Sequence, residues 1–139
     1  MEWWTAPAES EDGRLIMVSG RSDIAQFRNN PRFTIRIEVL WHYDKSPQAG
    51  MPSDADAKIM GTATDNLNDI LAKDPVAVMT GIYTGAGERT WVFYTLSTHI
   101  FQKKLNEALA ELPLLPLEIT AENDPAWEAY AELQTFEVK

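Results

Sequence analysis

The segment from Val76 to Leu96, VAVMTGIYTGAGERTWVFYTL, most constrains the fold, because it has the pattern of two strands joined by a tight turn. Both halves alternate in polarity or size and are rich in β-branched and aromatic residues, which suit a pleated sheet. Gly85 and Gly87 accept a positive φ without steric cost, so we expect a short hairpin loop between the halves. The second half has Trp91 on one face and Tyr94 on the other, which predicts a central strand.

Residues 33–43 give the clearest single strand of the chain. From Phe33 to Tyr43 apolar and mostly polar residues alternate with period two over eleven positions, which is typical of a strand buried on one side. An acidic loop is expected over 7–13. A second strand is predicted over 14–20 (RLIMVSG), with one or two helical turns over 22–30. A last strand is predicted over 114–120, where Pro116 indicates an edge position or a bulge.

Two amphipathic helices flank the hairpin. The first is expected over 53–73, with Ser53 as its N-cap and Asp74-Pro75 as its stop. The second is expected over 97–112, capped by Ser97 or Thr98 and ended by Pro113. A short closing helix follows Asp124, with Pro125 as its first residue.

The order of elements from Phe33 onward is therefore β-α-β-β-α-β. With right-handed crossovers this order predicts an α+β fold of the ferredoxin-like kind: a two-layer sandwich of an antiparallel sheet and two helices on one face. The extra N-terminal strand and the short C-terminal helix lie outside this core. No linker or repeat divides residues 1–139, so we expect a single domain.

The sheet face without helices needs a cover, because several large aromatic side chains point toward it. Three covers are available: the N-terminal segment with Trp3 and Trp4, the C-terminal helix, or another protein molecule. The N-terminal segment is the preferred interpretation, ahead of a dimer interface, so both a monomer and a homodimer stay open.

The net charge of −9 and the absence of cysteine restrict the classes of function. An acidic surface repels the phosphates of nucleic acids and anionic lipids, so neither a nucleic acid nor a membrane is an expected partner. Zero cysteines exclude disulfides and thiolate chemistry and fit a reducing cytoplasm. Carboxylates near the N terminus do not fit a secretory signal, which also favours a cytoplasmic protein.

The chain has no catalytic, metal-binding or cofactor signature. His42 lies near Asp44 and His99 opens the second helix, but two isolated histidines without metal-ligand spacing are more typical of packed or surface residues. No cofactor and no metal are therefore expected. A pocket beside the N-terminal segment, near His42, Tyr43 and Trp91, is the site that a small-molecule binder or an enzyme would use.

Acidic residues dominate the end of the chain. From Glu107 to the C terminus eight carboxylates stand against Lys139 alone. A solvated, solubilising surface is the simpler interpretation. The alternative is a docking surface for a basic protein, whose encounter the charge would accelerate. The residues predicted for such a surface are Glu118, Glu122, Asp124, Glu128 and Glu132.

The segment Asn123-Asp124-Pro125-Ala126-Trp127-Glu128-Ala129-Tyr130 resembles the closing Asp-Pro-x-Trp-x-x-Tyr motif of a bacterial family known as domain of unknown function family 695. Further short matches cover most of the chain: Trp3-Trp4, Gly50-Met51-Pro52, and Gly81, Gly87-Glu88-Arg89 and Tyr94 of the hairpin. Similar endings occur in the regulator of ribonuclease E activity B, whose family is ferredoxin-like and binds that nuclease to inhibit it. After Leu133 the sequence Gln134-Thr135-Phe136 departs from both patterns.

The resemblance implies the fold already indicated by the order of strands and transfers no catalytic residue. Physically, Asp124 can cap the closing helix while Trp127 and Tyr130 dock on the sheet. The favoured hypothesis is a non-enzymatic, protein-binding or regulatory domain with an acidic surface. The alternative is a small-molecule-binding protein or enzyme with the pocket named above.

Overall fold

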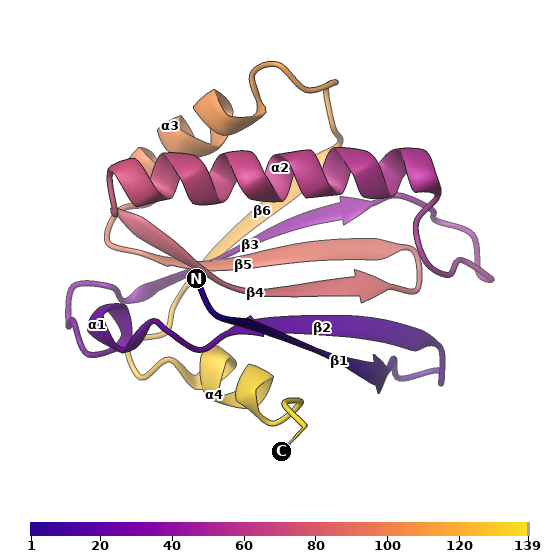
Figure 1. Cartoon of the computed structure of the whole chain (residues 1–139), viewed down its shortest axis with the longest axis horizontal. Helices are drawn as coiled ribbons and strands as arrows, with labels where there is room; N and C mark the ends of the chain where they lie inside the picture. Colours follow the sequence, from indigo (N-terminus) through magenta and orange to yellow (C-terminus); the bar gives the residue numbers. More distant parts are fainter. Residues whose placement is uncertain (139) are drawn as a thin grey trace.

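The computed structural model describes residues 1–138, which form six strands and four helices (Figure 1). In chain order these elements are β1 (Trp3–Glu9), β2 (Leu15–Arg21), α1 (Ala25–Arg28), β3 (Ile35–His42), α2 (Asp54–Lys73), β4 (Ala77–Gly85), β5 (Glu88–Thr95), α3 (Thr98–Leu109), β6 (Leu117–Asn123) and α4 (Glu128–Gln134).

All six strands join one open sheet in the order β1-β2-β4-β5-β3-β6, and every neighbouring pair is antiparallel. The predicted hairpin is confirmed as β4 and β5. Its turn contains three consecutive residues with positive φ, Gly85 at 147°, Ala86 at 53° and Gly87 at 84°. The chain is therefore a mixed fold of α-helices and antiparallel strands.

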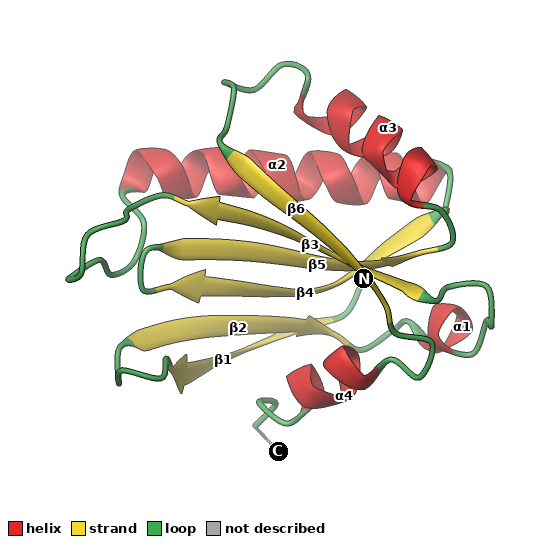
Figure 2. Ribbon diagram, turned by 180° about the vertical axis from the view of Figure 1, so that it is seen from behind, coloured by secondary structure: helices red, strands yellow, loops and turns green. Residues whose placement is uncertain are grey.

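Helices α2 and α3 cover the same face of the sheet, as the sequence predicts (Figure 2). The predicted caps are confirmed: the side chain of Ser53 accepts from the N–H of Asp56, and that of Ser97 accepts from the N–H of Ile100. The helix α3 ends at Leu109, three residues earlier than expected. Buried apolar residues of both helices pack here on the inward-facing residues of β3, β4 and β5.

The opposite face is covered by the C-terminal helix, not by the N-terminal segment. Trp127, Tyr130 and Leu133 pack there on residues that include Val18, Val78 and Tyr94. The preferred prediction of an N-terminal cover is wrong, because residues 3–21 form β1 and β2 and extend the sheet beside β4. The period-two geometry of β1 sends Trp3 to the α2 face and Trp4 to the α4 face.

Other boundaries also differ from the sequence predictions. The acidic loop expected from Pro7 begins only after Glu9, since Pro7 lies inside β1 opposite Met17. The last strand is shifted to 117–123, so Pro116 precedes it. The helix α4 begins at Glu128 instead of Pro125 because Trp127 has a left-handed backbone, with φ 55° and ψ 42°.

Candidate functional site

The closing motif fixes α4 to the sheet through one buried carboxylate. Asp124 is 8 % exposed and accepts hydrogen bonds from the Tyr94 hydroxyl at 2.6 Å and from the N–H groups of Glu128 at 2.9 Å and Ala129 at 3.0 Å. Burial by itself would raise the pKa of Asp124, but the hydrogen bonds from Tyr94, Ala129 and Glu128 lower it overall. Burial, followed by the contact with Asp124, raises the pKa of Tyr94.

Aromatic packing completes this attachment. The indole of Trp127 stacks on the ring of Tyr94 with their centroids 4.0 Å apart, and its Nε1 donates to the carbonyl of Phe33 at 2.7 Å. The predicted docking of Trp127 and Tyr130 on the sheet is therefore confirmed. Within the predicted partner surface, Asp124 has a structural role and presents little of its carboxylate to solvent.

The other four residues of the predicted partner surface are exposed but lie on two elements. Glu118 and Glu122 belong to β6, and Glu128 and Glu132 belong to α4. Strand register adds acidic residues that the sequence analysis did not select, Glu38 and Glu88. Residues that face each other across a ladder have their side chains on the same side of the sheet. Glu38 faces Val92 of β5 and Thr120 of β6, and His42 faces Glu88.

Three adjacent strands therefore present one acidic face, on the side of the sheet that carries α4. We call this surface the acidic face and define it by the carboxylates of Glu38, Glu88, Glu118 and Glu122. Basic side chains lie among and beside them, since Arg14 and Lys45 line one surface depression with Glu88 and Glu118. Arg36 pairs with Glu122 at 2.8 Å, and the ring nitrogens of His42 lie 3.4 Å from Glu88 and 3.6 Å from Glu118.

A hollow of about 330 Å³ separates the acidic face from α4. Its polar lining includes Arg36, Glu38 and Tyr83 from the sheet and Glu132 from α4, and Phe136 adds an aromatic wall. Burial, followed by the nearby charges of Glu132 and Glu38, raises the pKa of Tyr83 to about 12. Both carboxylates thus lie close to one phenol in the lining, and their negative charges would attract a cation placed in the hollow.

Arg36, which lines the hollow, also carries a buried donor without an acceptor in the described part of the chain. The Nε of Arg36 is buried and has no hydrogen-bond acceptor among residues 1–138, although the terminal nitrogen of the same side chain binds Glu122. A buried donor without a partner is costly in a folded protein.

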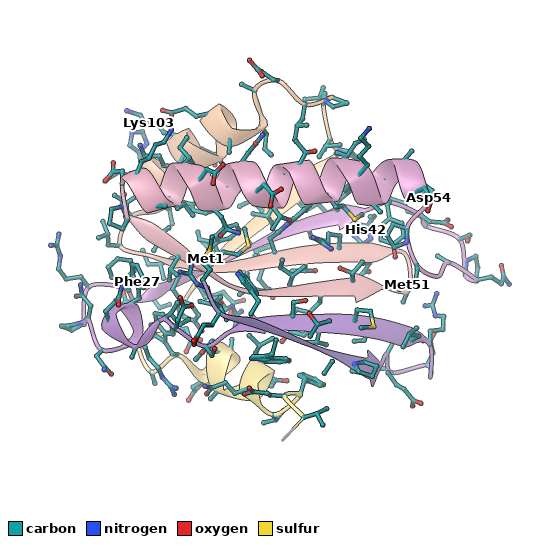
Figure 3. All side chains as sticks on the ribbon, viewed as in Figure 1. Met1, Phe27, His42, Met51, Asp54 and Lys103 are labelled. Atoms are coloured by element: carbon teal, nitrogen blue, oxygen red, sulfur yellow. The ribbon has the colours of Figure 1, made fainter. Side chains whose placement is uncertain are left out.

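The structure does not bring together the three residues of the predicted pocket. Trp91 is 1 % exposed under α2, where its Nε1 donates to the Thr64 hydroxyl at 2.9 Å. Tyr43 packs on the same side, and its hydroxyl donates to the carbonyl of Gly50. His42 belongs to the opposite face and lies at the C-terminal end of β3 (Figure 3).

Within residues 1–138 no group of three histidine, aspartate or glutamate side chains is arranged to hold a metal ion. None of the helices formed by these residues has the length and apolar character needed to cross a membrane.

The model of a family of unknown function, DUF695, matches residues 2–134. The chain belongs to this family. The resemblance drawn from the closing motif is thus confirmed. Comparisons with curated proteins and with solved structures gave no match. The likeness to the regulator of ribonuclease E activity B is not shown by these comparisons and stays a prediction.

Proposed function

We propose that the chain is a non-enzymatic, protein-binding domain whose acidic face recognises a basic segment of another protein. The observation that carries the proposal is the gathering of Glu38, Glu88, Glu118 and Glu122 on one side of three adjacent strands. The cations near these carboxylates are Arg36, Arg14 and Lys45, and they offset only part of this charge. Glu132 adds to the negative charge from α4. The net charge of −9 favours attraction of a cationic partner over long range.

The hollow beside α4 gives such a partner a specific place for one cationic side chain. A lysine or arginine there would meet Glu38 and Glu132, and the rings of Tyr83 and Phe136 would cover its aliphatic stem. These contacts are of the kind that distinguishes a binding site from a merely solubilising surface.

The proposal is tested by titrating a fluorescently labelled oligolysine peptide into the protein and following fluorescence anisotropy. We expect saturable binding at low ionic strength that weakens at high ionic strength. In the triple variant Glu38→Gln, Glu88→Gln and Glu118→Gln, affinity is expected to fall about tenfold, at about 0.5 kcal/mol for each exposed charge pair lost.

A matched triple variant controls for net charge. Asp65→Asn, Asp69→Asn and Glu107→Gln remove the same charge from exposed positions of α2 and α3, on the other side of the sheet. We expect this variant to lose less than about threefold in affinity, which is the remaining long-range effect. Equal losses in the two variants would contradict a localised site, and an absence of binding to the unmodified protein would contradict the proposal.

The hollow supports a second candidate function, the binding of a small molecule. Its volume of about 330 Å³ and the two carboxylates in its lining, those of Glu38 and Glu132, suit a compact cationic ligand. A thermal-shift screen of amines and amino acids tests this, since a ligand of the native state raises the midpoint of unfolding. The same screen with Glu132→Gln shows whether a hit binds in the hollow.

We also propose that β3 to β6 form a ferredoxin-like core and that the protein acts in the cytoplasm. The order β4-β5-β3-β6, the antiparallel pairing and the shared face of α2 and α3 support the first statement. The absence of cysteine from all 139 residues supports the second.

A further inference from the structure

The strand β6 forms one edge of the sheet, and its outer side is open (Figure 2). Within residues 1–138 it pairs with β3 alone. The N–H of Asp124 donates to the carbonyl of Thr34, its opposite residue, at 2.7 Å. Because hydrogen-bonded pairs alternate along an antiparallel ladder, the backbone groups of Ile119 and Ala121 point away from β3. Residues 118–123 are also exposed at every position.

The other edge of the sheet is protected in a way that β6 is not. In β1 the N–H of Ser10 donates to the carbonyl of its opposite residue Arg14, so the same alternation turns the nitrogen of Pro7 outward. Proline has no N–H to offer an added strand, and natural proteins use it to block sheet edges. The segment 117–123 contains no proline. The two edges therefore differ in their capacity to accept another strand.

An apolar groove borders β6 on the side of α3. It has a volume of about 500 Å³ and is lined mainly by apolar residues of α3, of the loop that follows it, and of β6. Leu114 in that loop is fully exposed, at 101 %, and Ile119 is 39 % exposed. Large apolar side chains in this position leave unfavourable contact with water that a partner would remove.

Carboxylates border β6 on its other side. Glu118 and Glu122 are 64 % and 68 % exposed and belong to the acidic face, since they oppose Leu40 and Arg36. A strand added beside β6 would point alternate side chains to the two faces of the sheet. One set would meet the apolar groove, and the other would meet Glu118 and Glu122.

We propose that β6 binds an extended segment of a partner protein as a seventh strand, in which apolar and basic residues alternate. The inference rests on the proposed function and specifies its partner. The apolar side chains of the segment pack against Ile119 and Leu114, its lysine or arginine side chains pair with Glu118 and Glu122, and its backbone pairs with Ile119 and Ala121.

Charge argues against a second copy of this chain as the occupant. An antiparallel pair of β6 strands that sets Ile119 opposite Ala121 also sets Glu118 opposite Glu122 twice across the two-fold axis. Like charges directly opposite each other destabilise a strand pair. A basic segment turns the same positions into favourable cross-strand pairs.

Binding is tested with a fluorescently labelled peptide of alternating lysine and valine residues, followed by anisotropy. A peptide of the same composition with paired lysines and paired valines is the control for charge and hydrophobicity. We expect the alternating peptide to bind at least about tenfold more tightly, because it alone places all valines on one side of the added strand.

Backbone pairing is tested separately. Methylation of the backbone nitrogen of every valine in the peptide blocks the N–H groups that face β6 in antiparallel pairing. Methylation of the backbone nitrogen of every lysine blocks the N–H groups that face solvent. We expect binding to be lost with the first set and kept with the second. The reverse dependence supports strand addition in parallel orientation. Equal effects of the two sets overturn strand addition.

A protein variant gives the complementary test. Ala121→Pro removes an outward N–H without removing a hydrogen bond to β3, and Ala121→Thr keeps that N–H in a strand-compatible residue. We expect at least a tenfold loss of peptide affinity for Ala121→Pro only.

The tests distinguish the two proposals. One result would overturn the seventh strand and still agree with the basic-partner function. In that result oligolysine binds in a salt-sensitive way, and neither Ala121→Pro nor the alternation of the peptide changes the affinity. If the protein alone is a dimer in analytical ultracentrifugation and Ala121→Pro makes it monomeric, the occupant of the edge is a second copy and the inference is overturned.

Discussion

Replacement of Asp124 by alanine tests whether the closing motif serves as a structural attachment. The variant removes the acceptor for two N–H groups of the first turn of α4, which costs about 1 kcal/mol for a helix cap. It also leaves the Tyr94 hydroxyl without its acceptor at a fully buried position, which costs about 1 to 2 kcal/mol. We therefore expect the free energy of unfolding to fall by about 2 to 3 kcal/mol.

The assay is urea unfolding followed by circular dichroism, with Tyr94→Phe and the double variant completing a cycle. Tyr94→Phe alone is expected to cost about 1 kcal/mol, since Asp124 keeps its two backbone donors. The double variant is then expected to be about 1 kcal/mol more stable than the sum of the single effects predicts. A loss below about 0.5 kcal/mol for Asp124→Ala would refute the attachment.

Three further predictions concern the same region. The folded-state pKa of Asp124 lies below the unfolded value of 3.8. The contribution of Asp124 to stability is therefore complete well above pH 3.8 and is lost as the pH falls through the lower folded value. Acid unfolding should show this loss, and Asp124→Asn should remove it. Gly81→Ala is expected to cost about 1 kcal/mol in urea unfolding, because the new Cβ would lie 2.7 Å from a methyl carbon of buried Leu133 and push α4 outward. Glu122→Gln is expected to change the free energy of unfolding by less than about 0.5 kcal/mol, since its ion pair with Arg36 is mostly exposed on the glutamate side; a larger loss would give that pair a structural role.

Local signals account for the parts of the fold that the sequence predicts correctly. The caps of α2 and α3 depend on a serine and the residues three positions after it, and the hairpin depends on Gly85 and Gly87 between two alternating segments. Each signal acts within a few residues, so no knowledge of the tertiary structure is needed.

Errors arose where a distant partner decides the conformation. Pro7 suggested a loop, but in β1 its nitrogen faces away from β2 and needs no hydrogen bond. The place of β1 and β2 beside β4 depends on a register that no local pattern encodes. With that edge of the sheet extended, α4 became the cover of the second face.

The same distinction explains which part of the candidate site the sequence predicts. Glu38 and Glu88 are fifty residues apart, and they become neighbours of Glu118 only through the registers of β3 with β5 and β6. The even-numbered residues of β3 were a signal for this, since Arg36, Glu38 and His42 share one face of a strand with a clear period of two. What was missing was the identity of the two neighbouring strands.

The fourfold spacing of Asp124, Glu128 and Glu132 shows how a local pattern can mislead about function. In a continuous helix these residues would form one acidic stripe, but α4 begins at Glu128 and the carboxylate of Asp124 turns inward to Tyr94. The stripe therefore shortens to two residues, and only Glu132 lines the hollow. The acidic face therefore lies on the sheet, beside the open edge of β6. A basic segment can there make backbone and side-chain contacts together.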